Sequence, residues 1–257
     1  MAGADDMSTT PDRFSDGPPP GKIAPSGGSA AHVVNSVEAI IFDMDGTMID
    51  SMPHHASTWQ DFARQHRVDM DIDELMRRTT GRTGIECVRL ILERPDMDEA
   101  EAWALVHEKE QLYRDIFGPI FREVAGFSAF HHAVRARGLK VGVGTAGDIH
   151  NVEFAMGHLR MTPPPDAIAR GDEGLSGKPT PAIFLAVAER MGVAPERCIV
   201  FEDAPFGIEA ARRAGMRAVG ICTTNTPEEL AGPHVITCVR DYHELIQSHF
   251  LEHLHDA

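Results

Sequence analysis

The sequence predicts an α/β fold, a doubly wound parallel sheet with a small all-helical domain inserted after its first strand. Six short apolar runs alternate with longer segments of helical periodicity, which is typical of a parallel sheet covered by helices on both faces. Predicted helices end at Gly138, Gly192 and Gly215, and each glycine precedes a predicted strand by a few residues. Glycine tolerates the left-handed backbone that closes a helix. These observations favour a Rossmann-like core.

The predicted strands are the apolar runs AIIF (39–42), KVGVG (140–144), DAIA (166–169), CIVF (198–201), AVGI (218–221) and HVIT (234–237). Between the third and fourth runs, a helix should begin with Thr180 as its N-cap and Pro181 at its first helical position.

Residues 53 to about 121 contain helical patterns but no convincing strand. We therefore predict a helical cap over residues 51–123, inserted between core segments 35–50 and 124–257. Residues 1–34 contain few large apolar side chains and are expected to form a disordered leader, since they cannot offset the entropy of ordering. The strongest helical pattern of the cap, expected to form its own core, comprises Ala102, Leu105, Val106, Lys109, Leu112, Tyr113 and Ile116.

The composition is that of an ordinary globular protein, with 42% hydrophobic and 25% charged residues in 257. A formal net charge of −15 disfavours nucleic acid as a partner, because such binding needs a basic surface. Four cysteines without CxxC spacing favour reduced thiols in the cytoplasm. No apolar stretch reaches the roughly 18 residues of a membrane span, so no membrane partner is expected. We expect a monomer or a weak dimer.

Polar side chains follow the predicted strands where a parallel sheet binds ligands, beyond the carboxyl ends of its strands. Asp43 and Asp45 follow the first run, and Thr145 follows the second. Lys178 lies in the loop SGKPTP, and the acidic pair of Glu202 and Asp203 follows the run CIVF. The inventory is therefore several carboxylates, a hydroxyl and an ammonium group.

These groups suit phosphoryl transfer, which needs a nucleophile, cations, hydrogen-bond donors and an acid for the leaving oxygen. Asp43 could attack phosphorus, and Asp45 could protonate the leaving alkoxide and then deprotonate water, which requires a raised pKa for Asp45. The proximity of Asp43 raises that pKa, whereas a bound metal lowers it. Lys178 would offset negative charge, and Thr145 would donate to a phosphate oxygen.

The acidic residues also predict a metal site. Glu202 and Asp203 with Asp43 offer hard oxygen ligands, few enough to leave waters in place, which suits Mg²⁺. A calcium-binding loop is disfavoured because the D-x-D-G spacing lacks a third acid before the glycine.

Each of these features also has a simpler structural explanation. The two aspartates could form a solvated turn, Lys178 could be a solvated loop residue, and Thr145 could be a turn residue. The acidic pair could merely favour the positive end of a helix. The joint order of the groups after the expected strands favours a functional site instead. His54 and His55 are expected to face solvent on a helix.

Four stretches of the chain resemble the motifs of the haloacid dehalogenase superfamily of phosphohydrolases. They are DMDGT at 43–47, GTAG at 144–147, GKPTP at 177–181 and FEDAPFGIEAARRAGM at 201–216. The helical insert resembles the small cap of the subgroup that includes β-phosphoglucomutase and sugar phosphatases.

The resemblance implies roles for individual residues. Asp43 would be the nucleophile and Asp45 the acid/base, while the phosphate binders would be Thr145, Ala146 and Lys178. The metal ligands would be Asp43, Asp203 and the backbone carbonyl of Asp45, with Glu202 at or near the metal.

In the mutase, a lysine and an arginine bind the distal phosphate from the stretch that corresponds to TGRTG at 80–84. Those two positions hold Thr80 and Gly84 here, with Arg82 between them. His55 and Lys109 fall where the mutase has residues of the cap that contact substrate. The cap candidates for substrate binding are therefore His55, Arg82 and Lys109.

We thus expect a Mg²⁺-dependent phosphatase that hydrolyses a small phosphorylated metabolite, foremost a sugar phosphate, through an aspartyl phosphate. A β-phosphoglucomutase-type phosphomutase is the alternative, and an inorganic pyrophosphatase is less favoured.

A dehalogenase is disfavoured because Asp45 would have no leaving oxygen to protonate. A phosphorylated signalling receiver would carry its acidic pair before the phosphorylated aspartate and would be about half this size. A binding protein without activity would be missing some of these groups, whereas all are present.

Overall fold

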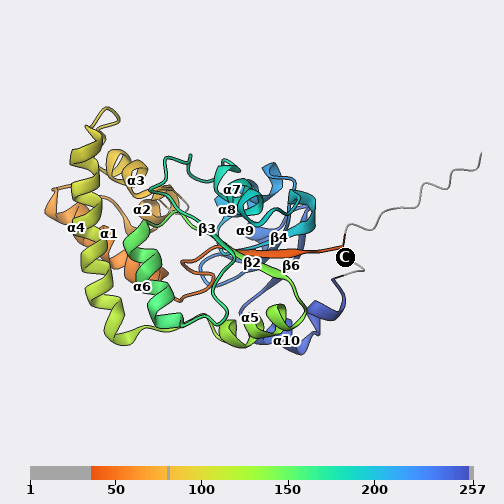
Figure 1. Cartoon of the computed structure of the whole chain (residues 1–257). Coiled ribbons are helices and arrows are strands. Elements are labelled where there is room, and N and C mark those ends of the chain that lie inside the picture. Colours follow the sequence, from red (N-terminus) through yellow and green to blue (C-terminus); the bar gives the residue numbers. More distant parts are fainter. Residues whose placement is uncertain (1–35, 80–81, 255–257) are drawn as a thin grey trace, which may run out of the picture. The chain divides into compact units, whose positions relative to one another are not determined.

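The computed structural model describes residues 36–79 and 82–254. The predicted leader over residues 1–34 and the position of Thr80 lie outside these residues. The described part of the chain contains a sheet of six parallel strands in the order β3-β2-β1-β4-β5-β6 (Figure 1). The strands are β1 (Ala39–Phe42), β2 (Lys140–Gly144), β3 (Ala167–Ala169), β4 (Cys198–Glu202), β5 (Arg217–Ile221) and β6 (Val235–Val239). The predicted doubly wound sheet is confirmed.

Helices cover both faces of this sheet (Figure 1). One face carries α5 (Phe127–Ala136) and α10 (Tyr242–Gln247). The other carries α7 (Ala182–Met191), α8 (Pro205–Arg213) and α9 (Pro227–Leu230). A sixth helix, α6 (Ile149–Leu159), follows β2, and three short 3-10 helices span Gly118–Ile120, Pro195–Arg197 and Phe250–Glu252.

The central strand β1 is buried on both faces, which explains why the run AIIF is apolar without alternation. Its side chains point to opposite faces in turn. Ile40 and Phe42 enter the hydrophobic cluster beneath α5 and α10, and Ala39 and Ile41 enter the cluster beneath α7 and α8. The two clusters hold β1 rigidly, so the residues that directly follow it are well positioned.

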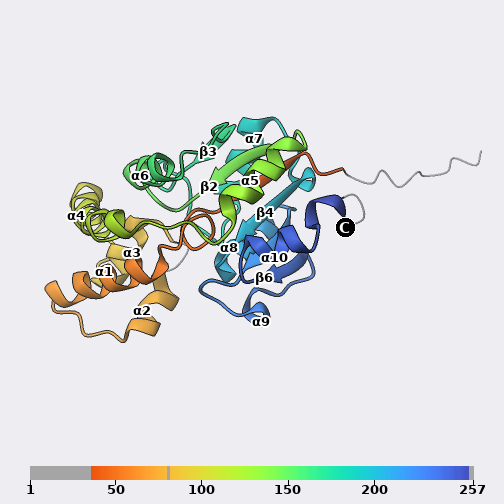
Figure 2. The same cartoon turned by 90° about the horizontal axis from the view of Figure 1, so that it is seen from below.

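In the described residues, the helices that follow β1 and precede Gly118 are α1 (Met52–Gln65), α2 (Ile72–Thr79), α3 (Gly84–Ile91) and α4 (Glu99–Phe117). We call residues 52–117 the helical insert, and Figure 2 shows its helices grouped at one end of the sheet. The buried residues of its own hydrophobic cluster are Trp59, Phe62, Ala63, Leu75, Cys87, Val88, Ile91, Met97, Ala102 and Val106.

The prediction that one face of α4 serves only this cluster was wrong for its C-terminal half. Ala102 and Val106 belong to the cluster of the insert, but Tyr113 belongs to the cluster beneath α5 and α10. Ile116 is 38% exposed. The reason is length, because the 19 residues of α4 run from the cluster of the insert to the cluster beneath α5 and α10.

The start of α7 differs by one residue from the prediction. Pro181 is the N-cap and the helix begins at Ala182. The Thr180 hydroxyl points back into the preceding loop, where it donates to the carbonyl oxygens of Ser176 and Gly177.

The two segments that join the insert to the sheet run beside each other. The Asp50 N–H donates to the Arg122 carbonyl at 3.1 Å, and the Val124 N–H donates to the Met48 carbonyl at 3.0 Å. Arg122 and Asp50 also form an ion pair at 2.6 Å. The division into a core and a cap at residues 51 and 123 stays a prediction.

None of the helices in the described residues is both long and apolar enough to cross a membrane.

Candidate active site

The residues predicted to act together meet where the strand order of the sheet reverses. Strand β1 lies between β2 and β4, and its register pairs Phe42 with Val143 and with Phe201. The polar residues after these three strands therefore emerge side by side at one edge, the usual ligand site of such sheets.

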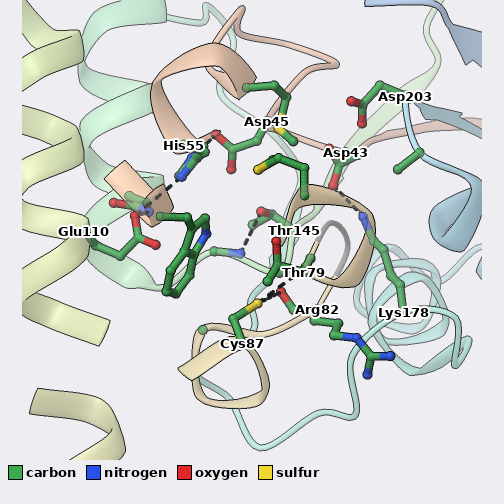
Figure 3. A pocket seen from close by; sticks show the side chains of 18 of the residues that line it. Asp43, Asp45, His55, Thr79, Arg82, Cys87, Glu110, Thr145, Lys178 and Asp203 are labelled. Atoms are coloured by element: carbon green, nitrogen blue, oxygen red, sulfur yellow. Dashed lines mark hydrogen bonds and ion pairs between the residues drawn. The ribbon is translucent and has the colours of Figure 1, made fainter. Parts of the chain in front are cut away.

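A cavity of about 100 Å³ opens at this edge (Figure 3). Predicted residues that line it are Asp43, Asp45, His55, Arg82, Thr145, Ala146, Lys178, Glu202 and Asp203. Further lining residues include Trp59, Met76, Thr79, Cys87, Glu110 and Asn151. The insert and the sheet thus both contribute walls. Lys109 does not line the cavity and lies behind His55.

Lys178 joins two of the carboxylates at the bottom of this cavity. Its Nζ lies 2.5 Å from Asp43 Oδ1 and 2.6 Å from Glu202 Oε1. Burial and the nearby Glu202 charge raise the pKa of Asp43 to about 7, although Lys178 opposes the rise. Burial lowers the pKa of Lys178, but the attraction to Asp43 and Glu202 outweighs this and raises it. Lys178 is therefore held as a buried ammonium ion.

Asp43, Glu202 and Asp203 form a cluster in which each offers an oxygen within 4.8 Å of the others. Both Glu202 oxygens already accept hydrogen bonds, from Lys178 and from the Ala204 N–H. Asp203 Oδ2 is buried and has no hydrogen-bond partner within the described part of the chain. Burial and the charges of Glu202 and Asp43 raise the pKa of Asp203 well above its usual value. This donor set fits a small hard cation such as Mg²⁺, which would bind the free oxygens of Asp43 and Asp203.

Two glycines of the sequence motifs leave room for these carboxylates. A Cβ atom on Gly46, whose φ is +78°, would lie 2.2 Å from Asp203 Oδ2. One on Gly207 would lie 1.7 Å from Glu202 Oε1. Real Cβ atoms essentially never approach so closely, so both positions require glycine for this arrangement.

Asp45 receives three hydrogen bonds at a single oxygen. Ser51 Oγ lies 2.7 Å, His55 Nε2 3.1 Å and the Tyr113 hydroxyl 3.5 Å from Asp45 Oδ1. None of the three uses Oδ2. Asp45 lines the cavity, so Oδ2 is the oxygen available to a substrate.

The expectation that Asp45 has a raised pKa was wrong for this arrangement. Burial raises the pKa of Asp45, but the attraction to His55 and the hydrogen bonds from His55 and Ser51 lower it below its usual value. These partners of its side chain, rather than Asp43, dominate its electrostatic surroundings.

His55 is buried rather than exposed to solvent, which corrects the sequence-based expectation. It is 8% exposed and stacks on Tyr113 with ring centroids 3.8 Å apart. Its Nδ1 lies 2.8 Å from Lys109 Nζ, and Lys109 is 2% exposed. Of the histidine pair, only His54 is partly exposed.

The remaining predicted residues have partners near the cavity. Thr145 Oγ1 accepts a hydrogen bond from the Gly147 N–H at 3.0 Å. The Arg82 guanidinium donates to the Arg78 carbonyl at 2.8 Å and lies over the Phe206 ring at 5.6 Å from its centroid.

Sequence reasoning missed several residues of this site. Ser51 is the N-cap residue of α1, but its hydroxyl makes no capping hydrogen bond and instead donates to Asp45. Tyr113 lies four residues after Lys109 on α4, a spacing that could have placed both near His55. Glu110 and Asn151 are brought together from α4 and α6, and no local pattern in the sequence predicts that contact.

A family model of the haloacid dehalogenase-like hydrolases matches residues 37–215. The chain belongs to this family. The matched segment includes β1, the helical insert and every cavity-lining residue named above, so the family assignment covers the whole site.

Curated relatives of this hydrolase include two phosphatases. It is 34% identical to fructose-1-phosphate phosphatase YqaB of Escherichia coli (strain K12), over 71% of this chain and 95% of the relative. It is 31% identical to validoxylamine A 7'-phosphate phosphatase of Streptomyces hygroscopicus subsp. limoneus, over 76% of this chain and 91% of the relative.

Among solved structures, the hydrolase is similar to β-phosphoglucomutase from Clostridium difficile. The TM-score is 0.74 at 26% identity, and the match covers 86% of this chain and 98% of the mutase chain. The Rossmann-like sheet with its flanking helices thus matches the fold of a known member.

Proposed function

We propose that the protein is a Mg²⁺-dependent phosphatase that hydrolyses small phosphorylated carbohydrates through an aspartyl phosphate on Asp43. One observation carries the proposal: Asp43 and Asp45 face one cavity with different partners, Lys178 for Asp43 and three hydrogen-bond donors for Asp45. Two carboxylates in different surroundings suit the separate roles of nucleophile and acid/base. The names of the two curated phosphatases support a phosphorylated sugar or sugar-like substrate.

In the proposed first step, a carboxylate oxygen of Asp43 forms a bond to phosphorus while the bond to the leaving oxygen breaks. Lys178 and Thr145 would hold oxygens of the transferring group. Mg²⁺, when bound by Asp43 and Asp203, supplies positive charge that stabilises the phosphoryl oxygens in the transition state.

Asp45 would serve both proton transfers. It must first take up a proton at Oδ2, against the lowering of its pKa by His55 and Ser51. It then gives that proton to the leaving alkoxide, and its carboxylate takes a proton from the water that attacks the aspartyl phosphate. The hydrogen bonds from Ser51 and His55 hold Oδ1, so the carboxylate keeps one orientation through both steps.

The walls of the cavity support a polar leaving group of modest size. Thr79 offers a polar atom, and Trp59 and Met76 offer apolar surface. This mixture suits a sugar or polyol, which presents hydroxyl groups and carbon-bound hydrogens together.

The test is a screen for phosphate release with Mg²⁺, with EDTA as the control. The panel contains fructose 1-phosphate, glucose 1-phosphate, hexitol phosphates, glycerol 3-phosphate, phosphoglycolate, a nucleotide and pyrophosphate. We expect release to be fastest from carbohydrate phosphates and to stop with EDTA. Fastest release from pyrophosphate, or release that EDTA does not affect, would contradict the proposal.

A phosphomutase is the second candidate, favoured by the structural likeness to β-phosphoglucomutase. It would use the same aspartyl phosphate but return the phosphoryl group to a sugar. Thr80 and Gly84 stand where the mutase is expected to bind its distal phosphate, which favours hydrolysis. Interconversion of glucose 1-phosphate and glucose 6-phosphate without phosphate release would reverse this order.

A further inference from the structure

Glu110 is a buried carboxylate at the wall of the cavity that the proposed steps do not use. It is 7% exposed. Its Oε1 accepts a hydrogen bond from Lys109 Nζ at 2.9 Å, and its Oε2 accepts one from Asn151 Nδ2 at 2.8 Å. Burial raises the pKa of Glu110, but the attraction to Lys109 and the hydrogen bonds from Asn151 and Lys109 outweigh burial and lower it. Glu110 is therefore an ionised group between the helical insert and α6 (Figure 3).

The amide of Asn151 is oriented by a third residue. Arg114 Nη1 donates to Asn151 Oδ1 at 2.7 Å, and a guanidinium can only donate. The NH₂ group of Asn151 must then face Glu110, as it does. The Asn151 N–H donates to Asp148 Oδ1 at 2.9 Å, which fixes this residue at the start of α6.

Glu110 is the carboxylate that pairs with the buried Lys109. Its side chain is fully buried, and a buried ammonium ion is costly unless it is paired. Glu110 Oε1, His55 Nδ1 and the Trp59 ring, whose centroid lies 4.4 Å from Nζ, surround its amino group. These three partners can each interact with one of the three N–H bonds of the Lys109 ammonium group.

A charged Lys109 determines which nitrogen of His55 carries the proton. An ammonium group has no lone pair, so it donates and His55 Nδ1 accepts. The proton of a neutral His55 then lies on Nε2, which donates to Asp45 Oδ1 at 3.1 Å. Because His55 donates to Asp45 Oδ1, the other oxygen, Oδ2, is left free to face the cavity.

We infer that Glu110, held by Asn151, is a positioning residue: it fixes Lys109, and through Lys109 it selects the His55 tautomer that orients the acid/base Asp45. The inference rests on the proposed function only for the role of Asp45. Loss of the Glu110 charge removes the ion-pair partner of Lys109, and a neutral Lys109 amine can accept a hydrogen bond from a proton that has moved from His55 Nε2 to Nδ1. His55 Nε2 would then present a lone pair to Asp45 Oδ1, and Asp45 would lose its orientation.

The first test measures the tautomer directly and needs no substrate. In ¹⁵N-labelled protein, the ring nitrogens of His55 are assigned by their absence in a His55→Asn variant. We expect protonated Nε2 and unprotonated Nδ1 in the wild type, and loss of this pattern in Glu110→Gln. Glu108→Gln is the matched control, because Glu108 is an exposed neighbour on the same helix. An unchanged pattern in a folded Glu110→Gln variant would overturn the inference.

The second test separates positioning from direct substrate binding. For the best substrate of the screen, we expect Glu110→Gln to lower kcat by about 10- to 100-fold, the range of other orienting partners, with little change in KM. Asn151→Ala should lower kcat in the same direction and to a smaller extent, and Glu108→Gln should not. A rise in KM alone would assign Glu110 to substrate binding and overturn the inference, as would a kcat within twofold of wild type.

Folding is checked by circular dichroism and thermal unfolding of each variant. If Glu110→Gln does not fold, Asn151→Ala tests the same chain of contacts. The inference then stands only if the protonation of the two His55 ring nitrogens changes in Asn151→Ala. If no substrate is turned over by the wild type, the proposed function fails while the tautomer measurement still decides the role of Glu110.

Discussion

Lys178 Nζ lies 2.5 Å from Asp43 Oδ1, so the proposed nucleophile and a buried cation are in direct contact. The contact joins residues 135 positions apart in the chain, one directly after β1 and the other in a loop before α7. It supplies positive charge beside a carboxylate that burial would otherwise protonate at neutral pH.

Asp43→Asn should abolish phosphate release, because an amide cannot form the aspartyl phosphate. The measurement is phosphate release with the best substrate and Mg²⁺, together with circular dichroism to show that the fold is intact. Asp61→Asn, at a solvent-accessible ion pair on α1, is the matched control and should keep wild-type activity. Wild-type turnover in Asp43→Asn would remove the nucleophile assignment.

Lys178→Met should lower kcat by about 100- to 1,000-fold, the usual effect of removing one charge-stabilising donor. It also leaves Asp43, Glu202 and Asp203 close together without their ammonium partner, which should lower the Tm. We expect Mg²⁺ to raise the Tm of this variant more than that of the wild type, because the ion would be the remaining positive charge. An equal or smaller rise with Mg²⁺ would count against the metal site.

Asp45→Asn should discriminate between leaving groups. An alkoxide needs a proton as it departs, whereas a nitrophenolate needs much less help. We expect turnover of the best carbohydrate phosphate to fall by about 100- to 10,000-fold. The first release of nitrophenolate from p-nitrophenyl phosphate, measured as a burst, should fall much less. Equal losses for both substrates would show that Asp45 does not act as the acid.

Gly46→Ala should weaken Mg²⁺ activation, because the new methyl group would collide with Asp203 Oδ2. Gly138→Ala is the matched control, since Gly138 has a similar φ of +75° and no atom within 4 Å of the added Cβ. Both variants should lose about 1 to 2 kcal/mol of stability through the left-handed backbone. Only Gly46→Ala should need more Mg²⁺ for half-maximal activity, and the same requirement in both variants would refute the steric explanation.

His131 should make the stability of the protein depend on pH. It is 1% exposed, and burial together with the charges of Arg135 and His132 lowers its pKa from 6.5 to about 4. Between pH 4 and 6.5 the unfolded chain therefore binds more protons than the folded chain, so the free energy of unfolding falls as pH is lowered through this window. The loss amounts to at most about 3 kcal/mol.

Urea unfolding at pH 7 and pH 4.5 measures this effect. His131→Leu should lose less stability between the two pH values than the wild type, because the titrating group is gone. His132→Leu removes an exposed neighbour and only the smallest of the three causes that lower the His131 pKa, so it should keep most of the wild-type dependence. Identical pH dependence in wild type and His131→Leu would show that His131 does not carry the effect.

The sequence alone predicted the sheet and the residues at its carboxyl edge. Apolar runs with helical segments between them require a parallel sheet, and the strands of such a sheet carry their following residues to one edge. Asp43, Thr145, Lys178 and Asp203 could therefore be placed together before any coordinates were known. Their separate chemical roles stay predictions, tested by the variants above.

Tertiary structure decided what surrounds Asp45. His55 was expected to face solvent, Tyr113 was expected in the core of the cap, and Ser51 was assigned no role, yet all three contact Asp45 or one another. Glu110 and Asn151 meet only because α4 of the insert lies beside α6. Local periodicity reports which face of an element is apolar. It does not report which distant element covers that face, so partners of buried charges are determined only when the chain is packed.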